Sequence, residues 1–428
     1  MIKMFCLILF SLQMSSGFAQ ETVQAKGDSV QYYRHKYSGK KTWEHIVSFP
    51  GTVASAPIFL LFKGIAKLTS VGFDDAAIRR TLDFLTSHNG SLGIRPRFTA
   101  RDGYGVMVFK KGLLSRQSII FLSATATVNG RQTYRLWWRD LNFFQGRVFA
   151  DVFVRYRKLL SENFYGIGPN AVKANRSNYD YDLFMAEMTF GVRPAKNIAI
   201  SAALGFDANK ILRGSNGELP TTQDLFGNSN LPGLFARPNL FVPQFMIKID
   251  TRNRKGNPSS GMESYLSGKI YKQTNGDRYD FWKMTFALRK YIHLFRNRVL
   301  LLRFTTEMTE PFADKEIPFY YLSTLGHHET MRGFRRGRFF DRDFLLTSLE
   351  YRIPTWYHFD TAFFVDAGQV ARNIFRDFQF DEFHYGYGVG IRYWTHKDFG
   401  VNFEVGFSED DVRIYLTTNL LFPKRRKN

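Results

Sequence analysis

The chain has 428 residues, a formal net charge of +21 and a single cysteine, Cys6. Beyond that position the sequence excludes a cysteine nucleophile, a disulfide and a thiolate metal site. Aromatic residues make up 17% of the chain, with 44 Phe and 21 Tyr, although the mean hydropathy is only -0.26. This combination is typical of a transmembrane β-barrel, whose wall is apolar outside and polar inside. Lys and Arg are spread along the chain, which disfavours a nucleic-acid partner.

The amino-terminal residues have the pattern of a secretory signal peptide. Lys3 precedes an apolar stretch from Met4 to Phe10, and small residues lead up to Ala19. We therefore predict a signal peptide over residues 1–19, too short and wrongly flanked for a membrane anchor. Downstream no run of about 18 or more apolar residues occurs, so no helical membrane span is expected.

Residues 20–90 are predicted to form a periplasmic amino-terminal segment with amphipathic helices. The clearest helical pattern covers Asp74 to Ser87, with Ile78, Leu82 and Leu85 on one face. Two interpretations stay open for this segment: it packs on the base of the barrel, or it lies in the interface of the inner leaflet.

From residue 91 onward the hydrophobic period is two. Val401 and Phe403 share one strand face, while Asn402 and Glu404 share the other, and residues 148–156, 244–250 and 345–353 alternate in the same way. Charged side chains on the polar face would be costly in a dry sandwich core, but a wet lumen accepts them. The alternation therefore predicts apolar side chains toward lipid and polar ones toward the lumen.

Counting these segments gives an all-β fold, an antiparallel transmembrane β-barrel of about sixteen strands. The barrel is expected over residues 91–422, followed by a basic tail over residues 423–428. Short periplasmic turns are expected at residues 193–197, 252–261 and 293–297. Long extracellular loops are expected at residues 162–178, 212–240, 311–341 and 373–382.

The two ends of the barrel form a candidate seam. The last predicted strand ends at Phe422, and a terminal aromatic is similar to an outer-membrane targeting signal. Pro96 in the first strand has no backbone donor and should weaken pairing there. Either the seam opens laterally at this point, or Pro96 merely sits at the end of its strand.

Two motifs carry the candidate site: Arg332-Gly333-Phe334 in a long loop and Phe364-Val365-Asp366-Ala367-Gly368 in a later strand. Alternation points Asp366 into the lumen, where the planar guanidinium of Arg332 could bind it bidentately. Gly333 permits a tight chain reversal, and Gly368 leaves room for a loop tip.

These residues predict an inward-folded loop pinned by Arg332 and Asp366, with Glu350 as a possible secondary partner. The alternative is a solvated basic loop, because Arg335, Arg336 and Arg338 follow closely.

The order and spacing of these motifs resemble the BamA/TamA outer-membrane assembly superfamily. A glycine-rich strand, with Gly386, Gly388 and Gly390 on one face, and a turn starting at Asp250-Thr251-Arg252 add to the resemblance. The three glycines let the loop approach the wall, or they let the barrel kink. The resemblance implies an inserted loop and an assembly role. POTRA domains, which usually precede such barrels, are not recognisable, because residues 20–90 lack their strand-helix-helix-strand-strand pattern.

Enzymatic signatures are weak. No Gly-x-Ser-x-Gly elbow occurs, and His327-His328 before Glu329 should point to opposite faces of an extended segment, which disfavours a metal site. Residues 163–168 look like a packed extracellular loop without chemistry. We therefore expect no catalytic residue, cofactor or metal.

Three functions stay open for a protein located in the outer membrane of a diderm bacterium. It could assist the insertion, assembly or export of proteins, with a periplasmic or lipoprotein partner in place of POTRA domains. Alternatively, it is a channel or transporter, or a structural subunit of an envelope complex. Expected partners are outer-membrane lipids, lipopolysaccharide and client proteins, and no nucleic acid.

Overall fold

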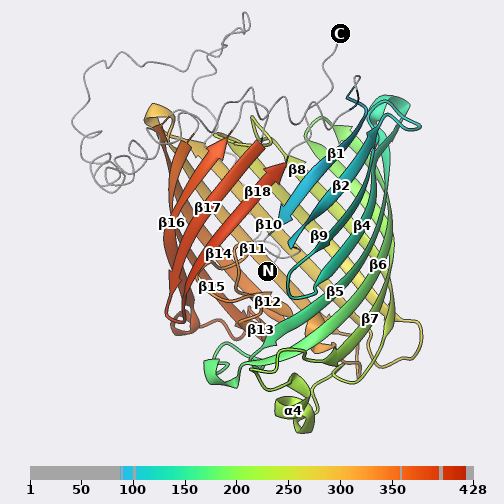
Figure 1. The fold of residues 1–428 in the computed structure, drawn as a ribbon, viewed down its shortest axis with the longest axis vertical. Helices are drawn as coiled ribbons and strands as arrows, with labels where there is room; N and C mark the ends of the chain where they lie inside the picture. Colours follow the sequence, from blue (N-terminus) through green and yellow to red (C-terminus); the bar gives the residue numbers. More distant parts are fainter. Residues whose placement is uncertain (1–86, 88–89, 100–102, 357–358, 395–398, 421–428) are drawn as a thin grey trace, which may run out of the picture. The chain divides into compact units, whose positions relative to one another are not determined.

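The computed structural model describes residues 87, 90–99, 103–356, 359–394 and 399–420. These residues form one sixteen-stranded antiparallel sheet, in which each strand pairs with the next along the chain. The sheet curls into a barrel (Figure 1), which confirms the predicted fold class. The short strands β12 and β13 pair with each other apart from this sheet.

The strands of the barrel and its inner hairpin have the following bounds: β1 (Leu92–Thr99), β2 (Gly103–Lys111), β3 (Ile119–Ala126), β4 (Gln132–Phe143), β5 (Val148–Phe164), β6 (Ser177–Ala195), β7 (Ile198–Arg213), β8 (Asn239–Asp250), β9 (Gly261–Gln273), β10 (Phe281–His293), β11 (Val299–Pro311), β12 (Ser323–Leu325), β13 (Phe339–Asp341), β14 (Asp343–Trp356), β15 (Phe359–Ala371), β16 (His384–Trp394), β17 (Phe399–Ser408) and β18 (Val412–Leu420).

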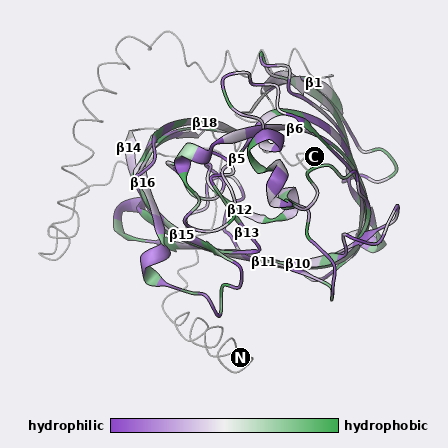
Figure 2. Ribbon diagram, turned by 90° about the horizontal axis from the view of Figure 1, so that it is seen from below, coloured by the Kyte–Doolittle hydropathy of each residue, from purple (hydrophilic) through white to green (hydrophobic). Residues whose placement is uncertain are grey.

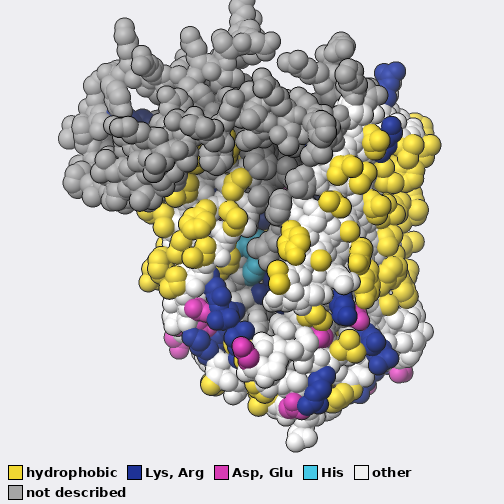
Figure 3. Space-filling view, viewed as in Figure 1, with side chains coloured by type: hydrophobic (Ala, Val, Ile, Leu, Met, Phe, Trp, Pro, Cys, Tyr) yellow, Lys and Arg dark blue, Asp and Glu magenta, His cyan; other side chains and the backbone are white. Residues whose placement is uncertain are grey.

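Alternation along the strands sorts side chains as the sequence predicted. In β15, Val365 is 49% exposed on the outside, whereas its neighbour Asp366 is 0% exposed and faces inward. Hydrophobic side chains form a band around the outer wall in Figure 3, and charged ones gather below it. The wall therefore has one apolar and one polar face, as a membrane barrel requires.

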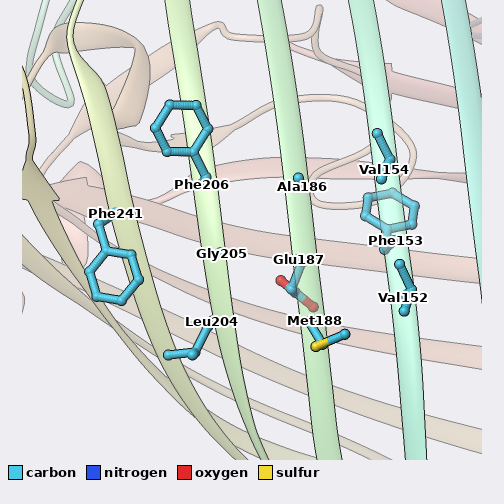
Figure 4. Close-up of a pocket in the computed structure, with 10 residues that line it drawn as sticks. All are labelled: Val152, Phe153, Val154, Ala186, Glu187, Met188, Leu204, Gly205, Phe206 and Phe241. Carbon is cyan, nitrogen blue, oxygen red and sulfur yellow. The ribbon is translucent and has the colours of Figure 1, made fainter.

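A shallow apolar depression of about 350 Å³ lies on the outer wall across β5 to β8. Figure 4 shows that it opens over Ala186, between the larger side chains of Val154, Met188, Leu204 and Phe206. Apart from Glu187 its lining is apolar, so a gap of this kind on the outer wall suits an acyl chain.

The connections differ at the two ends of the barrel. The turn after β6 spans two residues between Ala195 and Ile198, whereas the connections after β5, β7, β11 and β15 are long. The long connections are those that the sequence predicted to be extracellular. The loop after β7 contains the short helix α4 (Thr222–Phe226), whose first turn is capped by Thr221.

The first strands are short at the long-loop end. β1 has 8 residues and β3 has 8, whereas β5 has 17 and β6 has 19. Although β1 and β18 lie near each other, no hydrogen-bonded register joins them within the described residues. The surface between β18 and these first strands is hollowed in Figure 3, and histidine side chains come into view inside.

The loop between β11 and β14 folds into the barrel instead of extending away from it. Seen from below in Figure 2, β12 and β13 lie inside the ring formed by the other strands. Because Phe319, Leu325, Phe334 and Phe339 are each 0% exposed, this loop brings its own hydrophobic core into the lumen.

Several predicted features lie outside the described residues: the signal peptide, the helix from Asp74 to Ser87 except for Ser87 itself, Phe422 and the basic tail. Pro96 lies inside β1, opposite Val106, and not at a strand end. The interpretation of Pro96 as a strand-end residue is therefore wrong. Among the described residues, no helix is long and apolar enough to cross a membrane.

Candidate functional site

The centre of the site is the contact between Arg332 of the inward loop and Asp366 of β15. Nε of Arg332 donates to Oδ2 of Asp366 at 2.8 Å, and Nη2 donates to Oδ1 at 2.7 Å. The backbone N–H of Arg332 donates to Oδ2 at 3.0 Å. This is the bidentate fork that a guanidinium can form and an ammonium cannot.

Both partners are shielded from water, and an aromatic ring supports the pair. The side chain of Arg332 is 6% exposed and that of Asp366 is 0% exposed. The guanidinium carbon of Arg332 lies 3.5 Å from the ring centroid of Phe364, which is a close cation–π contact. Burial alone would lower the pKa of Arg332, but the hydrogen bonds and charge of Asp366 raise it. The cation is therefore stabilised in its charged form.

Glu350 of β14 joins this pair to a wider charge network. One carboxylate oxygen, Oε2, accepts from Nη1 of Arg332 at 3.1 Å and from Nη2 of Arg392 at 2.6 Å. The other oxygen accepts from Nε of Arg352 at 2.8 Å. Arg392 also donates to Glu404 of β17 at 3.0 Å. Thus three arginines from three parts of the chain converge on one buried carboxylate.

Arg303 of β11 holds the loop from a second side. Its guanidinium donates to Oγ of Ser348 at 2.8 and 3.0 Å and to the backbone carbonyl of Glu329 at 2.9 Å. It also lies 3.6 Å from Oδ1 of Asp366. Since Glu329 belongs to the loop and Ser348 to the wall, Arg303 links the loop to β14.

Gly333 brings the loop against the last two strands. Its N–H donates to the hydroxyl of Tyr415 in β18 at 3.1 Å, and its carbonyl accepts from Oγ of Ser408 at 3.0 Å. Its φ of +93° is one that other residues rarely adopt, and a Cβ there would lie 2.6 Å from the carbonyl oxygen of Phe407. The pinned loop therefore contacts β18, the last strand of the sheet.

The glycines of the wall make room for the loop in two places. A Cβ on Gly386 would lie 1.9 Å from the carbonyl oxygen of Arg332, and one on Gly368 would lie 3.3 Å from the sulfur of Met331. On Gly388 and Gly390 the nearest atoms belong to β15 and β17. Close approach of the loop thus explains why glycine stands at positions 368 and 386. Packing between neighbouring strands of the wall explains the glycines at positions 388 and 390.

Phe334 completes the motif on the apolar side. It is 0% exposed and packs with Leu325, Met331 and Phe339. The Phe339 ring stacks on His384 of β16, with ring centroids 3.8 Å apart. The small core formed by these loop residues fixes the backbone that presents Arg332.

Toward the long-loop end a second cluster packs the loop against the inner wall. We call it the aromatic plug. Its rings come from the loop (Phe319, Tyr320, Tyr321, Phe340), from the wall (Phe164, Tyr179, Tyr181, Tyr271, Phe281) and from the connection between β9 and β10 (Tyr279). Phe164 lies 5.1 Å from Phe319 and 5.2 Å from Phe340 between ring centroids. Tyr321 donates from its hydroxyl to Asp207 at 2.8 Å, so the plug is held by apolar and polar contacts.

Comparison with known proteins agrees with this geometry. A family model described as the Omp85 superfamily domain matches residues 120–397. The chain belongs to the Omp85 superfamily. It is therefore an outer-membrane β-barrel of the type predicted from the Arg332 and Asp366 motifs.

Two solved structures share the fold. BamA from Haemophilus ducreyi lacking POTRA domains 1–3 has 18% sequence identity and a TM-score of 0.58, covering 77% of this chain and 70% of that chain. CdiB from Escherichia coli has 10% identity and a TM-score of 0.50, with coverages of 82% and 73%. At these identities the likeness extends to the fold.

Other cations of the loop differ from Arg332 in their surroundings. Arg335 is 36% exposed and lies 3.2 Å from Asp411. Arg338 is buried, donates to Asp410, and covers the ring of Tyr165 at 5.0 Å. Only part of this Omp85 loop is therefore solvated, and the alternative of a wholly solvated basic loop does not describe it.

The structure contradicts one expectation about His327 and His328. His327 and His328 do not point to opposite faces, because His327 has a φ of +107° and the two ring centroids lie 4.0 Å apart. Residues 163–168 are packed as expected, since Phe164 and Tyr165 are buried and Phe164 joins the aromatic plug. Among the described residues no group of three or more His, Cys, Asp or Glu is placed to hold a metal.

A polar cavity of about 340 Å³ lies beside the Arg332 network. It is lined by Arg289, Arg303, Glu350 and Glu404 from the wall and by His328 from the loop. Space of this size between charged groups suits water, which gives two to four hydrogen bonds to otherwise unmatched polar atoms. The lumen of this barrel is thus lined by charged groups beside the loop and by aromatic rings at the plug.

Sequence reasoning missed Arg303, Arg392, Glu404, Tyr415 and Ser408 as parts of the site. All five lie on the inward face of their strands, so the alternation of side chains alone could have reduced the number of candidate site residues. What it could not supply was the path of the loop, which decides which inward residues are touched.

Proposed function

We propose that this Omp85 barrel assists the insertion, assembly or export of proteins at the outer membrane, with a periplasmic or lipoprotein partner in place of POTRA domains. The observation that carries the proposal is the placement of a buried, pinned loop beside an unpaired seam. Arg332 and Gly333 anchor the loop between β15 and β18, and β18 shares no register with β1 within the described residues.

Packing of the loop against the inner wall disfavours a passive pore as the main function. The aromatic plug joins loop rings to wall rings, with Phe319 5.1 Å from Phe164 and Tyr321 5.0 Å from Tyr271 between ring centroids, and it narrows the long-loop end of the lumen. A pore that conducts freely needs a continuous polar path. A client chain that leaves through the wall does not need one.

The seam has features that would let it open at low cost. β1 is short, and Pro96 within it removes one backbone donor. A proline inside a strand is expected at the edge of a sheet, which is where β1 lies. Opening between β1 and β18 would therefore break fewer hydrogen bonds than opening between any other neighbouring strands.

A disulfide across the seam tests this proposal. Cys6 is first replaced by serine, because it is the single cysteine of the chain. A cysteine at Ile94 in β1 is then combined with one at Ile414 or Leu416 in β18, all outward-facing and exposed. After oxidation in cells, we expect outer-membrane or surface proteins to fall in abundance, as measured by quantitative proteomics of the outer membrane.

The matched control uses Ile94→Cys with Val108→Cys, which are register partners between β1 and β2. This disulfide adds the same cross-link without closing the seam, so we expect normal protein levels. Unchanged levels with a fully oxidised seam disulfide would contradict the proposal. Affinity purification from the native outer membrane would then identify the clients and the periplasmic partner.

The polar cavity beside Arg332 favours a channel as the second candidate function. Conductance measured in planar bilayers distinguishes the assembly function from the channel function. An assembly barrel with an intact plug should conduct little, and Arg332→Ala should raise its conductance. Steady, substrate-dependent conductance of the wild-type protein would favour the channel.

A further inference from the structure

The connection between β15 and β16 is a rigid loop whose own hydrogen bonds fix its shape. Oδ1 of Asn373 accepts from the N–H groups of Phe375 and Arg376, both at 3.2 Å, and the N–H of Asn373 donates to Asp377 at 3.0 Å. Ile374 is 2% exposed, and its N–H donates to Asp343 of β14 at 3.0 Å. The loop is therefore anchored to the barrel, and its side-chain directions are defined.

This rigid loop displays aromatic side chains to the outside. Phe375 is 60% exposed, Phe378 is 39% exposed and Phe380 is 81% exposed. Phe378 packs edge to face against Phe380 at 4.9 Å and against Phe383 at 5.6 Å. We call these four residues the aromatic tip. Phe378, Phe380 and Phe383 pack together, and Phe375 is exposed on the same loop. Exposed Phe rings are costly in water, because each forgoes burial of its apolar surface.

The aromatic tip continues the lipid-facing wall without a break. Phe383 lies 6.5 Å from Tyr385, the first outward aromatic of β16. Tyr385 and Tyr387 are 54% and 56% exposed, and Tyr387 stacks on Phe407 of β17 at 5.8 Å. The loop lies at the lower end of β15 and β16 in Figure 1. One apolar strip therefore extends from the barrel wall onto the loop.

Two of the three carboxylates of the loop are engaged in hydrogen bonds. Glu382 accepts from Nε2 of the buried Gln369 at 2.9 Å and from Asn170 of another loop at 3.4 Å. Asp377 accepts from the N–H of Asn373. Asp381, next to Phe380, is exposed, so the Phe rings lie beside one solvated negative charge, as at the boundary between headgroups and acyl chains.

We propose that the aromatic tip inserts into the outer leaflet of the membrane and anchors the barrel beside β15 and β16. The occupant is lipid, at the boundary between headgroups and acyl chains, where aromatic girdles of outer-membrane barrels lie. Continuity with the lipid-facing strip favours lipid over a partner protein, since the same apolar surface is already solvated by acyl chains. Insertion removes the exposed Phe rings from water.

Site-directed spin labelling measures this insertion directly. The Cys6→Ser protein with Phe380→Cys is labelled with a nitroxide and reconstituted in dilauroylphosphatidylcholine vesicles. Accessibility to oxygen, which concentrates in the bilayer, is compared with accessibility to a water-soluble nickel complex. Val365→Cys on the outer wall provides the lipid reference, and Phe235→Cys, an exposed Phe of the loop after β7, provides the water reference.

We expect the oxygen-to-nickel ratio at position 380 to approach that at 365 and to exceed that at 235 several-fold. Phe375→Cys should give the same result, and it replaces position 380 if that variant loses heat-resistant folding on gels. A ratio at both positions equal to that at 235 would overturn the proposal, and would then favour an aqueous surface that binds a protein partner.

Discussion

Arg332 and Asp366 meet inside the barrel through three hydrogen bonds, two between their side chains and one from the Arg332 backbone. The contact joins a residue of a long loop to a strand of the wall at a place that water barely reaches. In such a place a single charge without its partner is strongly destabilising, so the pair holds the loop only as a unit.

Replacing Arg332 with alanine leaves Asp366 as a buried carboxylate with one remaining cation nearby, Arg303 at 3.6 Å. We expect a loss of about 3 to 5 kcal/mol in unfolding free energy. The protein is reconstituted in vesicles and unfolded at increasing urea concentrations. The folded fraction at each concentration is read from its heat-modifiable mobility on gels.

Two variants calibrate that result. Arg332→Lys keeps the charge but loses the bidentate fork, so we expect an intermediate stability. Arg335→Ala removes a half-exposed arginine of the same loop that pairs with Asp411, and should cost at most about 1 kcal/mol. Equal losses of unfolding free energy for Arg332→Ala and Arg335→Ala would contradict a loop pinned by Arg332 and Asp366.

Glu350→Gln tests the role of the shared carboxylate. Three arginines donate to Glu350, and neutralising it leaves excess buried positive charge. We expect a loss of at least about 3 kcal/mol in unfolding free energy. The control is Glu310→Gln. The partner of Glu310, Arg342, is 29% exposed, so this variant should lose at most about 1 kcal/mol of unfolding free energy.

Gly386→Ala should push the loop away from the wall, because the added Cβ would lie 1.9 Å from the Arg332 carbonyl oxygen. Overpacking of this kind typically costs about 1 to 3 kcal/mol. Gly268→Ala in β9 is the matched control, since a Cβ there meets nothing within 4 Å. Limited proteolysis of the loop in intact cells should detect the difference, and equal protection of both variants would argue against close approach.

Tyr415→Phe removes the hydroxyl that accepts from the Gly333 N–H and donates to the Phe334 carbonyl. A buried N–H left without its partner costs about 1 to 3 kcal/mol. We expect a lower unfolding midpoint than for Tyr385→Phe, whose side chain is on the outer wall. If the two variants have the same unfolding midpoint, the contact of the loop with β18 does not stabilise the protein.

The strands and the direction of their side chains could be predicted because a barrel wall imposes a period of two at every position. Val365 and Asp366 are neighbours with opposite surroundings, and their chemistry alone assigns each to lipid or lumen. The pairing of Arg332 with Asp366 could be predicted because Asp366 is the single inward carboxylate of the motif from Phe364 to Gly368.

Contacts that depend on the fold of the loop could not be predicted. The positive φ of His327 brings two histidines together that an extended segment would separate. The aromatic plug joins Phe164 to Phe319 and Phe340, and no local pattern in the sequence encodes that meeting. Long-range packing of irregular chain decides both.

The most direct test of the central claim is a double-mutant cycle on Arg332 and Asp366. Unfolding free energies are measured for wild type, Arg332→Ala, Asp366→Ala and the double variant in the same vesicles. A pinned loop predicts that the double variant is destabilised far less than the sum of the single variants, with a coupling energy of up to about 3 kcal/mol. Additive effects, with a coupling energy near zero, would contradict the account.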